Sequence, residues 1–137
     1  MRVQQILETC LYVNDLDAAE AFYRVTLGLE LESRQPGRHV FFHCGNSMLL
    51  LFEAEACRQI DSGIPPHGAH GPGHAAFAVP AKHVDQWRQH LIASNVAIEK
   101  EVSWPGGGRS IYFRDPSGNS LELATPSIWG LPDLLSS

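Results

Sequence analysis

The chain has 137 residues, of which 44% are apolar and 18% are charged, and its formal net charge is −5. This composition is that of a folded domain rather than a disordered segment, and no apolar run approaches the roughly 20 residues that cross a bilayer. The negative charge, with no basic cluster, excludes nucleic acid and anionic membranes as natural partners. Cys10, Cys44 and Cys57 lack zinc-finger spacing, and the first residues do not resemble a secretory signal, so we expect a reducing, cytoplasmic setting.

The first half of the chain predicts a strand, a helix and three further strands. The segment 16–27 places its apolar residues on one helical face, and Gly28 follows it as a helix stop. Alternating or fully apolar stretches favour strands on either side of that helix. We expect these strands at residues 5–13, 30–35, 38–44 and 47–53.

The second half predicts the same succession of elements. A linking loop rich in Gly and Pro covers 54–72 and is long enough to act as a lid. The next helix is expected at 81–94, and an apolar tail at 126–137 is expected to pack on its own domain or across a dimer. The strands of this half are expected at residues 73–79, 97–102, 109–114 and 120–125. We therefore treat the chain as a single domain built from two βαβββ modules, about 5–53 and 73–125.

The repeat pairs residues that carry chemistry. Glu8 and His74 take the same place at the start of the first strand of each module. A Gly-Asn-Ser sequence precedes the last strand of each module, and that register makes Leu49 the counterpart of Glu122.

Strand alternation places three ligand-type residues on one face. If the leucines and valines face the helices, then Glu8, His74 and Glu122 point to the other side, among small residues. Each has an ordinary explanation by itself: a solvated edge carboxylate, a core or rim histidine, and the polar half of an alternating strand. Their symmetry-related positions favour a metal site with room for a ligand.

The same segments resemble a known family. They read ETCLYVNDL at 8–16, AFY at 21–23, LGL at 27–29, GHAAFAV at 73–79 and FRDPSGNSLEL at 113–123. Over about residues 5 to 125 the chain resembles the vicinal-oxygen-chelate superfamily, also called the glyoxalase/bleomycin-resistance/dioxygenase family. The resemblance implies an α+β fold in which two βαβββ modules form a curved mixed sheet around a metal or ligand cavity.

The resemblance also implies the site. Glu8, His74 and Glu122 would hold one divalent ion, for which Mn, Zn, Ni and Fe all remain open. Glu122 or Glu8 would double as a catalytic base. A homodimer is expected, and since some members build the site from two chains, Glu8 of one copy can serve the His74 of another. Leucine cannot ligate, so Leu49 weighs against lactoylglutathione lyase, whereas three-ligand sets occur in extradiol dioxygenases and fosfomycin thiol transferases of this superfamily.

Further residues are expected to contact a substrate in the cavity or at its mouth. They are Arg109, Tyr12, Tyr112, Leu49 and Trp104. Arg109 follows three glycines and would bind a carboxylate or phosphate, although a surface arginine beside a turn explains it equally well.

Two classes of function follow. The first is a metal-dependent lyase, isomerase or transferase acting on a small oxygen-rich molecule by Lewis-acid catalysis. The alternative is a metal-free binding protein, like the drug-sequestering bleomycin-resistance members, or a small extradiol-type dioxygenase. The dioxygenase ranks lower because its usual site has two histidines and one carboxylate. A purely structural ion is a further reading.

Overall fold

The computed structural model describes residues 1–58 and 63–135, and it divides into two compact units. Unit 1 comprises Met1–Gly73 with Pro116–Asn119, and unit 2 comprises His74–Asp115 with the remaining C-terminal residues. Parts of the expected linking loop (59–62) and tail (136–137) lie outside the described residues. Within the described part of the chain, no helix is both long and apolar enough to cross a membrane.

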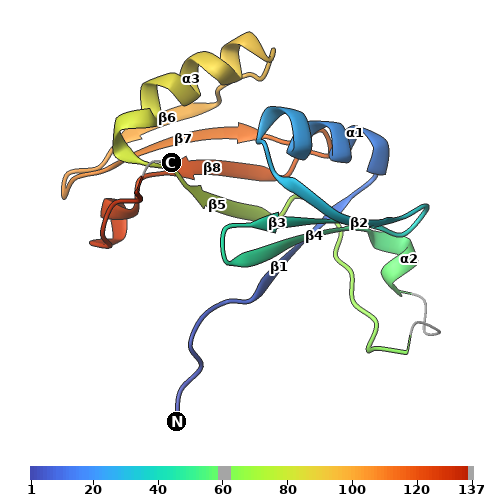
Figure 1. Cartoon of the computed structure of the whole chain (residues 1–137). Coiled ribbons are helices and arrows are strands. Elements are labelled where there is room, and N and C mark those ends of the chain that lie inside the picture. The colour runs from blue at the N-terminus through green and yellow to red at the C-terminus, as the bar shows by residue number, and fades with distance from the viewer. Residues whose placement is uncertain (59–62, 136–137) are drawn as a thin grey trace. The chain divides into compact units, whose positions relative to one another are not determined.

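Unit 1 contains a four-stranded mixed sheet (Figure 1). Its strand order is β1-β4-β3-β2, with β1 parallel to β4 and the other neighbours antiparallel. In chain order its elements are β1 (Glu8–Val13), α1 (Leu16–Ala21), the π-helical turn η1 (Phe22–Thr26), β2 (Glu30–Gln35), β3 (His39–Cys44), β4 (Ser47–Glu53) and α2 (Ala54–Arg58).

Unit 2 repeats this topology with the strand order β5-β8-β7-β6. Its elements are β5 (His74–Ala78), the short 3-10 turn η3 (Ala81–His83), α3 (Val84–Ala93), β6 (Lys100–Ser103), β7 (Arg109–Arg114), β8 (Ser120–Ala124) and the 3-10 turn η4 (Pro126–Trp129). Strand β5 is again parallel to the last strand of its sheet. The predicted α+β fold with two βαβββ modules is confirmed.

The first helix forms where the sequence predicts it, with one refinement. Asp15 is its N-cap, and its side chain accepts a hydrogen bond from the Ala18 backbone N–H at 3.0 Å. The expected helix over 16–27 continues beyond α1 as the π-helical turn η1, and it ends at Gly28, whose φ of +72° favours glycine.

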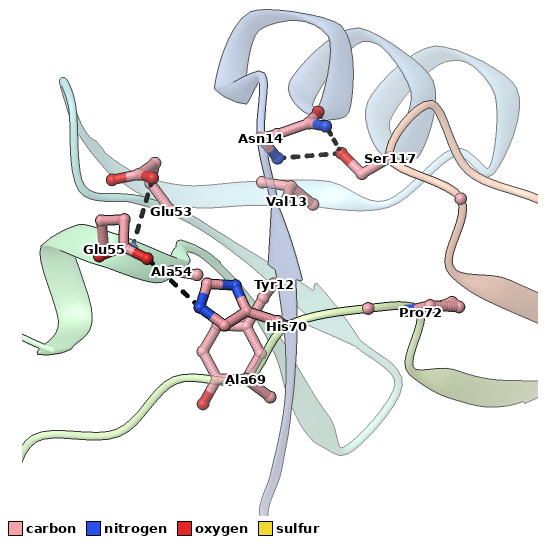
Figure 2. A pocket seen from close by; sticks show the side chains of 12 residues that line it. Tyr12, Val13, Asn14, Glu53, Ala54, Glu55, Ala69, His70, Pro72 and Ser117 are labelled. Atoms are coloured by element: carbon pink, nitrogen blue, oxygen red, sulfur yellow. Dashed lines mark hydrogen bonds and ion pairs between the residues drawn. The ribbon is translucent and has the colours of Figure 1, made fainter.

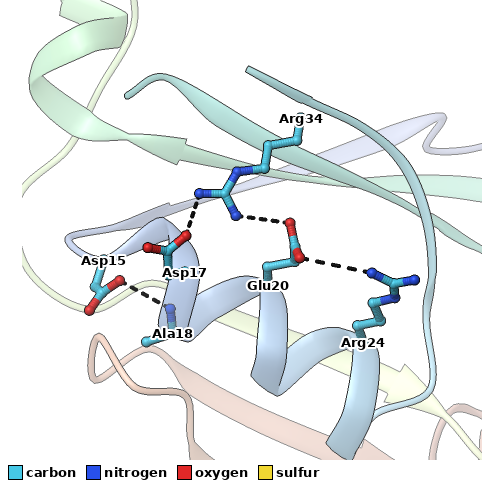
Figure 3. A network of polar contacts seen from close by, with 6 residues as sticks. All are labelled: Asp15, Asp17, Ala18, Glu20, Arg24 and Arg34. Carbon is cyan, nitrogen blue, oxygen red and sulfur yellow. Dashed lines mark hydrogen bonds and ion pairs between the residues drawn. The ribbon is translucent and has the colours of Figure 1, made fainter. Parts of the chain in front are cut away.

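Ion pairs tie the polar side of α1 to strand β2. Arg34 contacts Asp17 at 2.5 Å and Glu20 at 2.9 Å, and Glu20 also lies 3.9 Å from Arg24 (Figure 3). The opposite side of the helix is apolar: Ala19 and the Tyr23 ring are fully buried. The helix therefore covers one face of the first sheet.

Strand pairing corrects the register of the repeat. Glu8 pairs with Met48 on β4, and His74 pairs with Ser120 on β8. The residue two positions further along each last strand is Leu50 in unit 1 and Glu122 in unit 2. The prediction that Leu49 is the counterpart of Glu122 is wrong by one residue.

This shift moves Leu49 to the other side of its sheet. Leu49 pairs with Thr9 and Phe42, and it is buried with Phe42 on the face that α1 covers. Leu50 instead packs with Phe52 and Cys57 on the face of Glu8. The conclusion that unit 1 offers no ligand at this position stands, because either residue is a leucine.

Two ends differ from expectation. Strand β1 starts at Glu8 rather than residue 5. The tail packs on its own unit only in part: Pro126 is buried and Asp133 accepts a hydrogen bond from the Ala81 backbone N–H, whereas Trp129 is 80% exposed and Leu135 is 98% exposed. Packing of the exposed residues across a dimer stays a prediction.

Candidate metal and substrate site

His74 and Glu122 meet on the open face of the second sheet. The Nε2 atom of His74 lies 3.5 Å from Oε1 of Glu122, and their side chains are 52% and 7% exposed. The Nδ1 atom of His74 lies 2.9 Å from the Ser120 carbonyl oxygen, which can only accept, so Nδ1 carries the hydrogen. In a neutral imidazole the Nε2 lone pair then faces a carboxylate oxygen, and only a proton or a cation between them relieves the repulsion.

This pair fits a divalent ion. Imidazole nitrogen and carboxylate oxygen are both common metal ligands, and two such atoms bound to a tetrahedral ion lie roughly 3.4 Å apart. A backbone carbonyl that fixes the tautomer of a ligand histidine is the usual outer partner in metal sites. His74 has that partner in Ser120.

Glu122 is held from its other side. Its Oε2 accepts a hydrogen bond from Ser110 Oγ at 2.5 Å, and Ser110 Oγ accepts one from Trp104 Nε1 at 2.9 Å. Ser110 is 1% exposed, so this contact is shielded from water. The sequence analysis missed Ser110, although its position two residues before Tyr112 places it on the same face.

Tyr112 pairs with Glu122 across the strands, and its ring stacks near that of His74 with centroids 6.5 Å apart. Burial raises the pKa of the Tyr112 phenol above its ordinary value, and the negative charge of Glu122 and a hydrogen bond to that carboxylate add to the rise. The phenol therefore stays protonated at neutral pH and can donate a hydrogen bond.

A hollow of about 400 Å³ lies beside this cluster. Two of its lining residues, Trp104 and Tyr112, were expected to contact substrate. Arg114 also lines it and is held by two hydrogen bonds to Glu99, at 2.8 and 3.2 Å. The full lining is Glu99, Lys100, Val102, Trp104, Tyr112, Arg114 and Ser120.

Glu8 belongs to unit 1 and stands exposed at the start of β1. Among the described residues, no three side chains of His, Cys, Asp or Glu gather closely enough to hold a metal. The structure thus brings together two of the three expected ligands, His74 and Glu122, within unit 2.

Arg109 points away from the cluster. It shares the face of Ile111, opposite that of Tyr112, and its guanidinium lies 3.0 Å from Asp85 on α3. Arg109 first, and Arg88 second, hold the pKa of Asp85 below its ordinary value. Arg109 was expected to bind substrate, but its contact with Asp85 gives it another role, which is to join α3 to strand β7.

Tyr12 lines a separate hollow of about 350 Å³ in unit 1. Figure 2 shows Tyr12 and His70 at this hollow, with Glu55 3.6 Å from the His70 ring. The Tyr12 hydroxyl is already engaged by Nδ1 of His67 at 2.6 Å. The linking loop is therefore fastened to β1 at this point rather than free of it.

The cysteines are poor nucleophiles. Burial raises the pKa of Cys10, and the charges of Glu8 and Cys57 raise it further. Burial likewise raises the pKa of Cys44. A thiol that stays protonated neither attacks nor ligates readily.

Comparison with known proteins gives consistent results. Residues 5–123 match the family model of the Glyoxalase/Bleomycin resistance protein/Dioxygenase superfamily. The glutathione transferase FosA of Serratia marcescens is 32% identical over 126 residues, spanning 92% of this chain and 84% of that protein. The metallothiol transferase FosB of Staphylococcus epidermidis is 27% identical over 134 residues, spanning 93% and 86%. The crystal structure of a lactoylglutathione lyase from Agrobacterium tumefaciens superposes with a TM-score of 0.92 at 44% identity, covering 96% of this chain and 100% of that one.

Proposed function

The chain belongs to the glyoxalase/bleomycin resistance protein/dioxygenase superfamily, and on that premise we propose that it is a divalent-metal-dependent enzyme. It acts on a small oxygen-rich molecule, and its reaction is the transfer of a thiol to that molecule. The metal ligands are His74 and Glu122, with Glu8 as the third.

One observation carries the proposal: the Nε2 atom of His74 lies 3.5 Å from Glu122 Oε1, while the other polar atom of each side chain is engaged elsewhere. Two ligand atoms left facing each other at a sheet surface are prepared for a cation. When bound, a divalent ion supplies Lewis-acid polarisation of a substrate oxygen.

The remaining tasks fall to residues of the chain. The hollow lined by Trp104 and Tyr112 receives the organic part of the substrate. As the deprotonated thiol sulfur forms a bond to carbon, the carbon–oxygen bond breaks and its electron pair moves to the oxygen. That oxygen gains negative charge and then takes up the proton that the thiol released. The phenol of Tyr112 keeps its proton and hydrogen-bonds Glu122, and it would redirect this hydrogen bond to that oxygen as the negative charge develops.

Thiol transfer is favoured over lyase chemistry by the composition of the ligand positions. A lyase that shuttles protons needs a carboxylate free of the metal, and the counterpart of Glu122 in unit 1 is Leu50. The names of two relatives, glutathione transferase and metallothiol transferase, also support transfer of a thiol. The lyase stays the second candidate because of the 44% identity to the Agrobacterium tumefaciens structure.

The test is a pair of assays on metal-loaded protein. We expect loss of the thiol when glutathione or cysteine is mixed with fosfomycin, and little product from the hemithioacetal of glutathione and methylglyoxal. Tyr112→Phe should lower the transfer rate without removing the metal. Turnover of the hemithioacetal alone would replace the transferase with the lyase, and no turnover together with no metal would favour the metal-free binding protein.

The third ligand is proposed to come from a second copy of the chain. Co-refolding Glu8→Ala protein with Glu122→Ala protein tests this, because a mixed dimer would contain one complete set of ligands. We expect metal binding in the mixture and none in either variant alone. If the mixture binds no more metal than either variant alone, all three ligands belong to one chain.

A further inference from the structure

A buried serine and a tryptophan hold the carboxylate of Glu122 from behind. Ser110 Oγ lies 2.5 Å from Glu122 Oε2, and Trp104 Nε1 lies 2.9 Å from Ser110 Oγ. The three residues come from three adjacent segments of unit 2: β8, β7 and the turn between β6 and β7.

The direction of this chain of hydrogen bonds is fixed by chemistry. An indole N–H can only donate, and an ionised carboxylate can only accept. Ser110 must therefore accept from Trp104 and give its own hydrogen to Glu122. A serine hydroxyl normally rotates between partners, but here both of its neighbours dictate one orientation.

The consequence concerns which oxygen of Glu122 is available. Oε2 accepts from Ser110, and Oε1 is the oxygen that faces His74 Nε2 at 3.5 Å, while the Tyr112 phenol also hydrogen-bonds this carboxylate. A carboxylate that offers one oxygen takes one coordination position on an ion, whereas a free carboxylate can take two. Holding Oε2 thus preserves an open position for an oxygen of the substrate.

We propose that Ser110 and Trp104 are positioning residues that keep Glu122 a one-oxygen metal ligand. The inference rests on the proposed function, because it assigns a task within the same metal site. Trp104 also lines the hollow beside the site and is 39% exposed, so a molecule in the hollow touches the far end of this chain of hydrogen bonds.

The experiment measures Zn²⁺ and Mn²⁺ affinity by calorimetry for wild type, Ser110→Ala, Ser110→Thr and Trp104→Phe. Loss of an outer partner of a metal ligand typically lowers affinity 10- to 100-fold. We expect Ser110→Ala to lose about 10-fold in Zn²⁺ affinity and Trp104→Phe to lose less, since Ser110 can still donate. Ser110→Thr keeps the hydroxyl and should restore most of the affinity.

Comparing the loss of Zn²⁺ affinity with the loss of Mn²⁺ affinity distinguishes a residue that positions Glu122 from one that only stabilises the fold around it. Freeing Oε2 lets the carboxylate bind with both oxygens, which suits Mn²⁺ with its preference for oxygen and higher coordination. Ser110→Ala should therefore lose more affinity for Zn²⁺ than for Mn²⁺. A variant in which the site is only less stably folded would lose affinity for Zn²⁺ and for Mn²⁺ to the same extent.

Matched controls remove a hydroxyl and an indole elsewhere. Ser47→Ala deletes a half-buried serine at the start of β4, whose hydroxyl donates to the Cys44 carbonyl. Trp87→Phe deletes the indole N–H on α3. Neither should change metal affinity, and the melting temperatures of all metal-free variants are recorded beside them.

The outcomes distinguish this inference from the proposed function. If wild type binds metal and Ser110→Ala binds both metals unchanged, or loses them in equal proportion, the positioning role is wrong and the proposed function stands. If wild type binds neither metal, both are wrong. Affinity that Ser110→Thr does not restore would also overturn the role of the hydroxyl.

Discussion

The two sheets share one topology but carry opposite chemistry on their open faces. In unit 1 this face is an apolar cluster, in which Leu50, Phe52 and Cys57 are buried and the partly buried Tyr12, Phe41 and Met48 pack against them. In unit 2 two of these positions hold polar groups, since Ser120 takes the place of Met48 and Glu122 that of Leu50, whereas Ala124 takes the place of Phe52.

The register makes the comparison specific. Leu50 corresponds to Glu122, and Phe41, which pairs with Leu50, corresponds to Tyr112, which pairs with Glu122. A repeated unit thus keeps its helix-covered core and varies its open face. One unit carries an apolar cluster there, and the other carries His74 and Glu122 with their hydrogen-bond partners. The first-strand residue, Glu8 in one unit and His74 in the other, is a ligand type in both.

The turns differ as well. In unit 1 strands β2 and β3 are joined by a short turn containing Gly37. In unit 2 the connection between β6 and β7 is longer, and it delivers Trp104 to Ser110. The longer turn is therefore part of the site rather than an incidental loop.

The largest predicted effect tests the register. Leu49→Glu puts a charge on the helix-covered face without a partner and should cost about 4 kcal/mol or more in unfolding free energy. Leu50→Glu puts it on the open face and should cost less, about 2 kcal/mol. Denaturant titration measures both. If lyase activity appears in either variant, it should be in Leu50→Glu. Equal destabilisation would contradict the corrected register.

A smaller effect is predicted for the turn that carries Trp104. A Cβ added at Gly108, where φ is +93°, would lie 2.6 Å from Ile128 Cγ2, whereas at Gly107 and Gly106 nothing lies within 4 Å. Gly108→Ala should cost about 2–4 kcal/mol from backbone strain and overlap together. Gly107→Ala should cost about 1–2 kcal/mol, because only its φ of +104° is unfavourable. Gly106→Ala is the control. Equal costs at 107 and 108 would show that the contact with Ile128 does not matter.

The smallest effect concerns the ion pairs that join helix to sheet in each unit. The pKa of Asp85 is lowered chiefly by Arg109, so the charged carboxylate stabilises the fold above the unfolded-state pKa of about 3.9. That stabilisation is lost as the pH falls through the lower folded-state pKa. Asp85→Asn should therefore flatten the acid side of the stability profile. A double-mutant cycle with Arg109→Met, followed by thermal melts from neutral pH into the acid range, checks the pair. A profile unchanged by Asp85→Asn would contradict this coupling.

The sequence predicted the fold closely because the helical spacing of apolar residues and the alternation along strands together mark its elements. The strands at 30–35, 47–53 and 109–114 have the expected bounds, since strand alternation and turn residues both mark them. The π-helical end of the first helix was not predicted, because a switch of hydrogen-bonding pattern leaves the apolar spacing almost unchanged.

The site was only partly predictable. His74 and Glu122 follow from alternation and the repeat. The register error at Leu49 arose from matching a turn sequence, Gly-Asn-Ser, whereas the pairing of strands decides which residues are equivalent. Ser110 could be placed on the correct face, but its contact with Glu122 depends on cross-strand neighbours that the sequence does not reveal. Alternation already places Arg109 on the face opposite Tyr112, since the two are three residues apart on one strand.

The most direct test of the account is a titration of metal-free protein with Zn²⁺ and Mn²⁺ by calorimetry. Wild type should bind close to one ion per chain. His74→Ala and Glu122→Ala should each lose at least about 100-fold in affinity, more than loss of an outer partner causes. Glu30→Ala, an exposed carboxylate on β2, should bind like wild type. Absence of binding by wild type, or undiminished binding by Glu122→Ala, would contradict the metal site and the function built on it.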